Sequence, residues 1–281
     1  MSNLMMAFIL TSIAGLATGF GALIAFCAKR TNFRFLSVST GLSAGVMLYV
    51  SFVELFPGAT LEIAKAGYGH RLSSFYSVLG FFGGIALIFL IDRLVPDAEN
   101  PHEVHPESEY TELHNTAKVS APTNHQRLLR MGIFTAIAIT IHNFPEGLAT
   151  FLTTLENPKL GIAIAFAIAL HNIPEGISVS VPIYYATGSR KKAFIWSCLS
   201  GFAEPVGALV IWSLLALIYR STVFSPPPVF LGIVSSMVAG IMVFISLDEL
   251  LPASRAYGKG HDSLYGLVAG MAIMALSLIL L

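Results

Sequence analysis

Hydrophobic residues along the chain group into eight long runs separated by short polar connections. Each run is long enough to cross a bilayer, for which about 20 apolar residues suffice. None shows the strict alternation of polar and apolar residues that a membrane β-strand requires. The runs cover residues 4–28, 35–56, 72–91, 131–155, 160–185, 193–219, 229–251 and 262–281. The pattern predicts an all-α integral membrane protein with eight transmembrane helices in a single domain, 1–281.

Composition supports this class and excludes others. Hydrophobic residues make up 55% of the chain and charged residues only 11%, against about 25% charged in soluble domains. The mean hydropathy is +0.74. These values exclude a disordered chain, a cytosolic enzyme and a nucleic-acid binder, so we expect lipid and no nucleic acid as a partner. Cys27 and Cys198 lie alone in apolar runs and predict no disulfide framework.

The positive charges predict the orientation. Of the 16 Lys and Arg residues, 12 lie in the connections after the first, third, fifth and seventh runs, and 4 lie in the other connections. The positive-inside rule places the larger group in the cytoplasm, so both termini are expected outside. The one long connection, 95–127, holds six acidic residues and four histidines. We predict a flexible cytoplasmic loop that either is simply solvated or binds metal weakly through His102, His105 and His114.

Two kinds of internal repeat stand out. Residues 50–57 match 245–252 in the pattern Ser-x-x-Glu-Leu-x-Pro, and the third and eighth runs share a Tyr followed by paired glycines. Gly-Phe in the first run matches Gly201-Phe202 if four residues are inserted before Gly207. Runs 1–3 therefore correspond to runs 6–8. Because equivalent runs are five apart, the second copy is inverted, a 3+2+3 arrangement typical of secondary transporters.

The second repeat is the motif His-Asn-x-Pro-Glu-Gly, which occurs in the fourth and fifth runs 29 residues apart. Its His and Glu are four residues apart and share one helix face. They are His142 with Glu146, and His171 with Glu175. Its proline removes a backbone hydrogen bond and predicts a kinked or broken helix near the bilayer centre, where transporters bind ions.

The chemistry of these residues points to divalent metal. An ionisable side chain at mid-membrane costs about 2.5–3.5 kcal/mol, and the central parts of the runs contain no Lys or Arg to compensate. Imidazole, carboxylate and amide oxygen together suit Zn²⁺, with Fe²⁺, Mn²⁺ and Co²⁺ as alternatives. Seven candidate ligands exceed fourfold coordination, which favours two adjacent metals bridged by glutamates. They are His142, Asn143, Glu146, His171, Asn172, Glu175 and Glu204.

Three further acidic residues lie near run ends. Glu54 lies at the outer end of the second run, and Asp248 and Glu249 lie at the inner end of the seventh. They are candidate stations for metal on its way in and out. The alternative is that water at the membrane interface simply solvates them.

The paired motifs and Gly-Phe-Ala-Glu-Pro at 201–205 resemble those of the ZIP (Zrt-, Irt-like) metal transporter family, and the resemblance covers essentially the whole chain. It implies a binuclear centre between spans 4 and 5, uptake into the cytoplasm across a bacterial inner membrane, and a homodimer. It also implies alternating access, in which spans 1, 4, 5 and 6 move against the rest. The first site would contain His142, Glu146, His171 and Glu175. The second would contain Asn143, Glu146, Asn172, Glu175 and Glu204.

We therefore predict a transporter of Zn²⁺, and also of Fe²⁺, Mn²⁺, Co²⁺ and Cd²⁺, with no cofactor beyond the transported ions. An intramembrane zinc hydrolase is one alternative. It would need an open coordination position and a general base, and the chain has no His-Glu-x-x-His motif. A metal sensor is another, but the longest connection is too short for a folded signalling domain. The prediction is therefore a transporter and not an enzyme.

Overall fold

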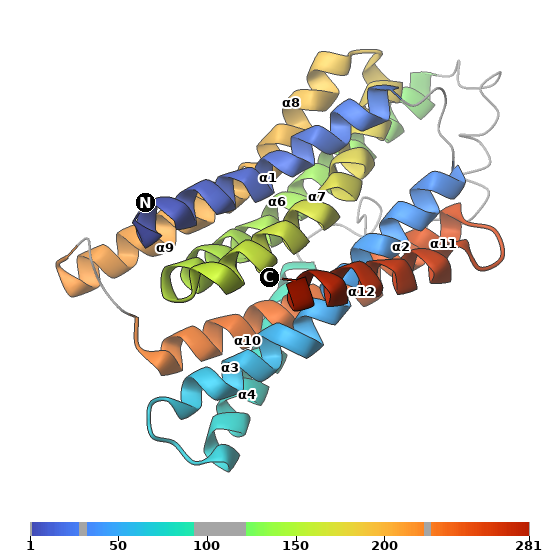
Figure 1. The fold of residues 1–281 in the computed structure, drawn as a ribbon. Helices are drawn as coiled ribbons and strands as arrows, with labels where there is room; N and C mark the ends of the chain where they lie inside the picture. Colours follow the sequence, from blue (N-terminus) through green and yellow to red (C-terminus); the bar gives the residue numbers. More distant parts are fainter. Residues whose placement is uncertain (1, 28–32, 93–121, 222–225, 281) are drawn as a thin grey trace.

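The computed structural model describes residues 2–27, 33–92, 122–221 and 226–280, which form helices joined by short turns, with no strand among them (Figure 1). In chain order the helices are α1 (Asn3–Cys27), α2 (Phe33–Val50), the π-helical turn η1 (Ser51–Leu55), α3 (Phe56–Ala64), α4 (His70–Asp92), α6 (Pro122–Glu156), α7 (Pro158–Thr187), α8 (Arg190–Gly201), α9 (Ala203–Tyr219), α10 (Pro228–Ile245), the π-helical turn η3 (Ser246–Leu250), α11 (Leu251–Tyr257) and α12 (Asp262–Leu280).

The helices are those of an integral membrane protein. Seven helical stretches in the described part of the chain are long and apolar enough to cross a membrane. Helix α6, with 35 residues, corresponds to the remaining predicted span and is not among the seven. It carries one copy of the polar motif at mid-length. About two thirds of the α7 and α10 spans are buried, against 28% of α12, so α7 and α10 are central and α12 is peripheral.

The long predicted connection is only partly described. Helix α6 begins at Pro122, so the last residues of the loop predicted over 95–127 are helical instead. The rest of that loop, with His102, His105 and His114, lies outside the described residues.

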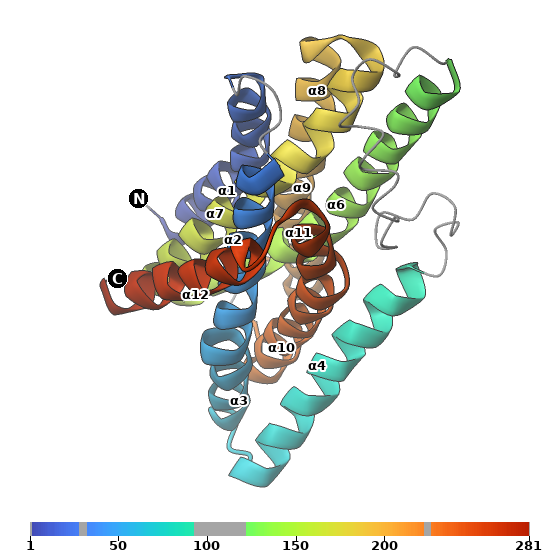
Figure 2. The same cartoon turned by 90° about the vertical axis from the view of Figure 1, so that its right-hand side faces the viewer.

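The helices pack as two groups (Figures 1 and 2). The first group contains α1, α6, α7, α8 and α9, and the second contains α2, α3, α4, α10, α11 and α12. The groups meet mainly where α2 packs on α7 and α10 packs on α6. This interface is apolar, since one cluster of buried side chains includes Met47, Leu55, Ile164, Ile168 and Ile245.

Matched close contacts attach the peripheral helices α4 and α12. A methyl group at Gly84 of α4 would lie 2.0 Å from the carbonyl oxygen of Met237 in α10. A methyl group at Gly270 of α12 would lie 2.1 Å from the carbonyl oxygen of Leu42 in α2. Glycine is therefore required at both contacts, because any side chain would push the helices apart.

The two π-helical turns occupy matched positions in α2–α3 and α10–α11. In η1 the N–H of Phe56 donates to the carbonyl of Ser51, and in η3 the N–H of Leu251 donates to the carbonyl of Ser246. Each turn holds a glutamate and precedes a proline by two residues. Such turns often mark functional sites in helices. They carry the acidic residues that were predicted near the run ends.

The α6–α7 hairpin positions the two copies of the motif. Asn157 forms the turn, and its side chain accepts a hydrogen bond from the Leu160 N–H at the start of α7. Pro158 occupies the first turn of α7, where its missing N–H costs little. In an antiparallel hairpin, residues equally far from the turn lie at the same depth. Glu146 is therefore level with His171, and His142 is level with Glu175.

The predicted breaks at the motif prolines are absent. Helices α6 and α7 run without interruption through Pro145 and Pro174. The interruption lies instead at Phe202, which separates α8 from α9 two residues before Glu204.

Candidate metal site

Seven polar side chains predicted to bind metal lie in the interior of the first helix group. All are at most 2% exposed. Helix α6 supplies His142, Asn143 and Glu146, α7 supplies His171, Asn172 and Glu175, and α9 supplies Glu204. Their burial is what the mid-membrane prediction requires. Whether they bind metal stays a prediction.

Each histidine faces the glutamate of the other helix. The distance from His142 Nε2 to Glu175 Oε1 is 3.2 Å, and the distance from His171 Nε2 to Glu146 Oε2 is also 3.2 Å. The two pairs follow from the hairpin, because each joins residues at the same depth. The predicted sharing of a face within one helix thus becomes two cross-helix pairs.

The two asparagines point their amide groups away from these pairs. Asn143 donates to the carbonyl of Ser200 at 3.2 Å, and Asn172 donates to the carbonyl of Ala14 at 2.8 Å. Asn172 also donates to Glu204 Oε1. These bonds fix which amide atom is nitrogen. Each side-chain oxygen is thereby left as an acceptor.

Six buried polar atoms of the site have no hydrogen-bond partner. They are Asn143 Oδ1, Glu146 Oε1, His171 Nδ1, Asn172 Oδ1, Glu175 Oε2 and Glu204 Oε2. Buried polar atoms normally have a partner, and an unsatisfied one costs about 1–3 kcal/mol. Five of the six are oxygens that can only accept or, for the carboxylates, carry charge. Such a set fits a divalent cation.

The side chains are not yet gathered around one point. Within the described residues, no three His, Cys, Asp or Glu side chains are arranged to hold a single metal ion. The cross-helix pairs explain why, because each imidazole already faces a carboxylate. A metal ion binding here would replace the partner in each pair, so the site must rearrange when it fills.

Close helix contacts hold the site together. A methyl group at Gly147 would lie 2.1 Å from the Glu204 carbonyl oxygen, and one at Gly176 would lie 1.8 Å from the Thr18 carbonyl oxygen. The glycine of each motif therefore lets α6 approach α9 and α7 approach α1. This explains why glycine follows the glutamate in both copies.

These contacts correct the alignment of the first and sixth runs. A methyl group at Gly15 would lie 2.3 Å from the Gly201 carbonyl oxygen, and one at Gly201 would lie 2.1 Å from that of Gly15. The contact is reciprocal, so Gly15 corresponds to Gly201 without a gap. The four-residue insertion expected before Gly207 is wrong. Thr18 is then the counterpart of Glu204, a relation that the sequence comparison missed.

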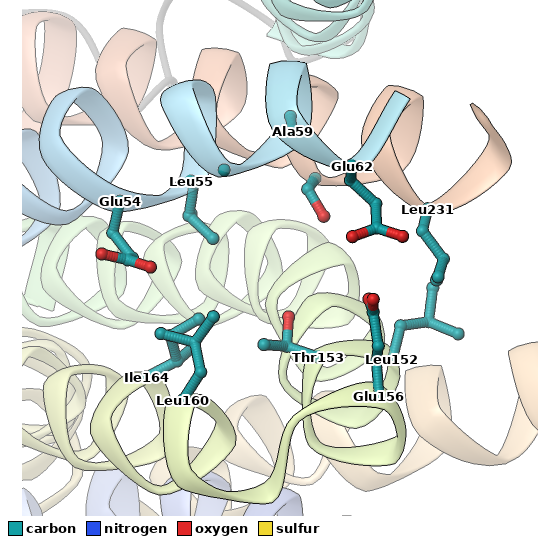
Figure 3. A pocket seen from close by; sticks show the side chains of 12 residues that line it. Glu54, Leu55, Ala59, Glu62, Leu152, Thr153, Glu156, Leu160, Ile164 and Leu231 are labelled. Atoms are coloured by element: carbon teal, nitrogen blue, oxygen red, sulfur yellow. The ribbon is translucent and has the colours of Figure 1, made fainter. Parts of the chain in front are cut away.

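The predicted stations lie on either side of the seven residues along the chain's span helices. Glu54 of η1 lines a cavity of about 80 Å³ together with Glu62 and Glu156 (Figure 3). Glu249 of η3 is 9% exposed and lies within electrostatic range of His142. Asp248 of the same turn is partly buried. Sequence reasoning missed Glu62 and Glu156, because they contact each other's surroundings only in the folded chain.

Known proteins resemble this chain over its full length. A family model described as ZIP zinc transporter matches residues 92–278. A zinc transporter ZupT of Clostridium perfringens is 54% identical, and the match covers 100% of this chain and 97% of the relative. Proteins of the same name from Streptococcus mutans and Oceanobacillus iheyensis are each 55% identical, with coverage of 98–100% of both chains. Together with the buried paired motifs, these matches establish that the chain belongs to the ZIP zinc transporter family.

Proposed function

We propose that this chain is an uptake transporter that carries Zn²⁺ across the bacterial inner membrane into the cytoplasm. The observation that carries the proposal is the set of unpartnered acceptor atoms buried in α6, α7 and α9. No Lys or Arg lies in this region, so a cation from outside is the natural partner. The three relatives above are named as zinc transporters, which favours Zn²⁺ over other divalent ions.

The cargo would occupy two adjacent positions. The first is formed by His142, Glu146, His171 and Glu175, and the second by Asn143, Glu146, Asn172, Glu175 and Glu204. Glu146 and Glu175 belong to both sets and would bridge the two ions. Fe²⁺, Mn²⁺, Co²⁺ and Cd²⁺ accept similar ligands, and we propose them as further cargo. The loop over 95–127 would bind metal only weakly, through His102, His105 and His114.

The proposed topology has eight spans in a 3+2+3 arrangement, with both termini outside. Helix α6 supplies the span beyond the seven apolar stretches. An inverted repeat of spans 1–3 and 6–8 explains why η1 and η3, and the contacts of Gly84 and Gly270, occur at matched positions. The division of Lys and Arg, 12 against 4, supports the orientation.

The two helix groups suggest how the site reaches each side of the membrane. We propose that α1, α6, α7, α8 and α9 move together against the other group, along the apolar interface between them. Glu54 and Glu249 would then meet the metal on opposite sides of the site. A homodimer is also proposed, on the family resemblance.

The competing readings differ in what they need. ZIP proteins are transporters and not enzymes, which removes the intramembrane hydrolase. A metal sensor would use the same buried ligands but would bind metal without moving it. Flux therefore separates a sensor from a transporter.

The test is Zn²⁺ influx into proteoliposomes containing the purified chain, beside Glu146→Ala and Glu175→Ala. Glu107→Ala, in the 95–127 loop, is the control for loss of a carboxylate. We expect saturable influx that both site substitutions abolish and the control leaves unchanged. Tight Zn²⁺ binding without influx in the unmodified chain would indicate a sensor. Influx that survives both site substitutions would place the pathway elsewhere.

A further inference from the structure

Lys65 bridges two helices that belong to different groups. It is the residue that follows α3, and its Nζ contacts Glu62 one turn earlier. The same Nζ donates to Glu156 Oε1 at 2.7 Å. Glu156 is the last residue of α6 and lies 91 positions away in the chain. By contrast, the ion pair of Arg34 with Asp262 joins α2 to α12 within one group.

A cavity lies behind this bridge. It has a volume of about 80 Å³ and lies between α3 and the α6–α7 turn. Figure 3 shows Glu62 and Glu156 pointing toward each other at one end, with Glu54 at the other end. Thr153 lines the wall between them. The positive-inside argument places this end of the chain outside the membrane.

The cavity is closed toward the metal site by apolar side chains. Leu55 and Ile164 line it and belong to the core cluster that joins the two helix groups. Both are at most 5% exposed. Metal can therefore pass from this cavity to the site only if the groups separate here, and separation also breaks the bridge from α3 to α6.

The bridge is suited to repeated opening. Hydrogen bonds to Glu156 and Glu62 raise the pKa of Lys65 above its ordinary value, so the ammonium stays charged at neutral pH. The Lys65 side chain is 58% exposed, and exposed ion pairs are individually weak. An arriving divalent cation would compete with the ammonium for the same two carboxylates.

We propose that Lys65 is a latch residue, whose bridge between Glu62 and Glu156 holds the outer mouth of the chain closed and must break before metal enters. The proposal rests on the proposed transport function. The simpler reading is a surface ion pair that has no effect on opening. The two readings differ in how often the cavity becomes accessible.

Alkylation of a cysteine placed in the cavity measures this accessibility. The probe is N-ethylmaleimide, which is small and uncharged, acting on Thr153→Cys in proteoliposomes with metal removed by a chelator. The chain without Thr153→Cys gives the background from Cys27 and Cys198. Because this rate needs no metal flux, it reports on the latch even if the Zn²⁺ influx assay of the unmodified chain fails.

The decisive variant is Lys65→Gln, with Lys159→Gln as the matched control. Lys159 is an exposed lysine in the first turn of α7, near the same end of the chain and outside the bridge. Loss of two weak ion pairs predicts alkylation about threefold faster in Lys65→Gln, with no change in Lys159→Gln. Equal rates in Lys65→Gln and the parent would overturn the latch, and so would equal acceleration by Lys159→Gln.

A charge exchange separates the bridge from a general effect on folding. Lys65→Glu alone should accelerate alkylation more than Lys65→Gln, because three carboxylates would then repel one another. Adding Glu62→Lys restores a cation between two carboxylates and should return the rate to that of the parent. If the double variant stays as fast as Lys65→Glu, the latch is overturned.

Discussion

His142 of α6 and Glu175 of α7 face each other across the hairpin, with Nε2 and Oε1 3.2 Å apart. His171 and Glu146 repeat the arrangement at the same distance. These pairs give the metal-free site a means of neutralising its own charge. When metal arrives, the imidazoles and carboxylates exchange one another for the cation. The same four side chains therefore serve two states of the transporter.

The cross-helix pairs predict strong coupling in the metal-free chain. Removing one partner of a buried ion pair is expected to cost about 3–5 kcal/mol, because the other charge loses its partner. His142→Ala and Glu175→Ala should each lower the melting temperature in chelator, and the double variant should lower it by much less than the sum. The pair His142→Ala with Glu146→Ala, on one helix, is the control. Greater coupling within α6 than across the hairpin would contradict the pairing.

Glu204 offers a separate test of the second metal position. Its Oε1 accepts from Asn172, and its Oε2 has no partner. In Glu204→Gln the amide oxygen can still accept from Asn172, but the charge is lost. We expect the number of bound Zn²⁺ ions, counted by calorimetry, to fall from two to one with the fold unchanged. Two ions bound in Glu204→Gln, or one in the parent, would contradict the proposed pair of sites.

The sequence was sufficient for the chemistry of the site. The spacing of His142 and Glu146, and its repetition 29 residues later, indicated one polar face on each of two buried helices. The cross-helix pairing could also have been predicted, because Asn157-Pro158 marks the hairpin turn and residues equally far from it must meet. The signal was present in a turn motif that the spacing argument did not use.

Other features depend on contacts that one sequence does not show. The identity of Gly19-Phe20 with Gly201-Phe202 suggested an insertion, whereas the reciprocal contact aligns Gly15 with Gly201. A local match of two residues is weaker than helix packing as a guide to equivalence. The bridge from Lys65 to Glu156 joins residues 91 positions apart, and nothing in either local sequence predicts it.

The contact of Gly84 with α10 predicts a position-specific loss of stability. A methyl group there would lie 2.0 Å from the Met237 carbonyl oxygen, whereas one at Gly83 would meet nothing within 4 Å. Overpacking costs about 1–3 kcal/mol, so Gly84→Ala should lower the melting temperature clearly. Gly83→Ala is the matched control and should leave it unchanged or raise it slightly, because alanine favours helix. Equal effects at both positions would show that α4 does not approach α10 so closely.

The proposed ligands also predict how uptake depends on pH. Zn²⁺ binds deprotonated carboxylates and neutral imidazoles, so protons compete with it for the same atoms. Zn²⁺ influx into proteoliposomes should therefore fall as the pH on both sides is lowered from 7 to 5. Lys65 does not contribute to this change, because hydrogen bonds to Glu156 and Glu62 raise its pKa above its ordinary value. It stays protonated throughout that range. Influx that instead rises steeply toward pH 5, with an inward proton gradient and no change in Zn²⁺ affinity, would mean that protons drive the transport.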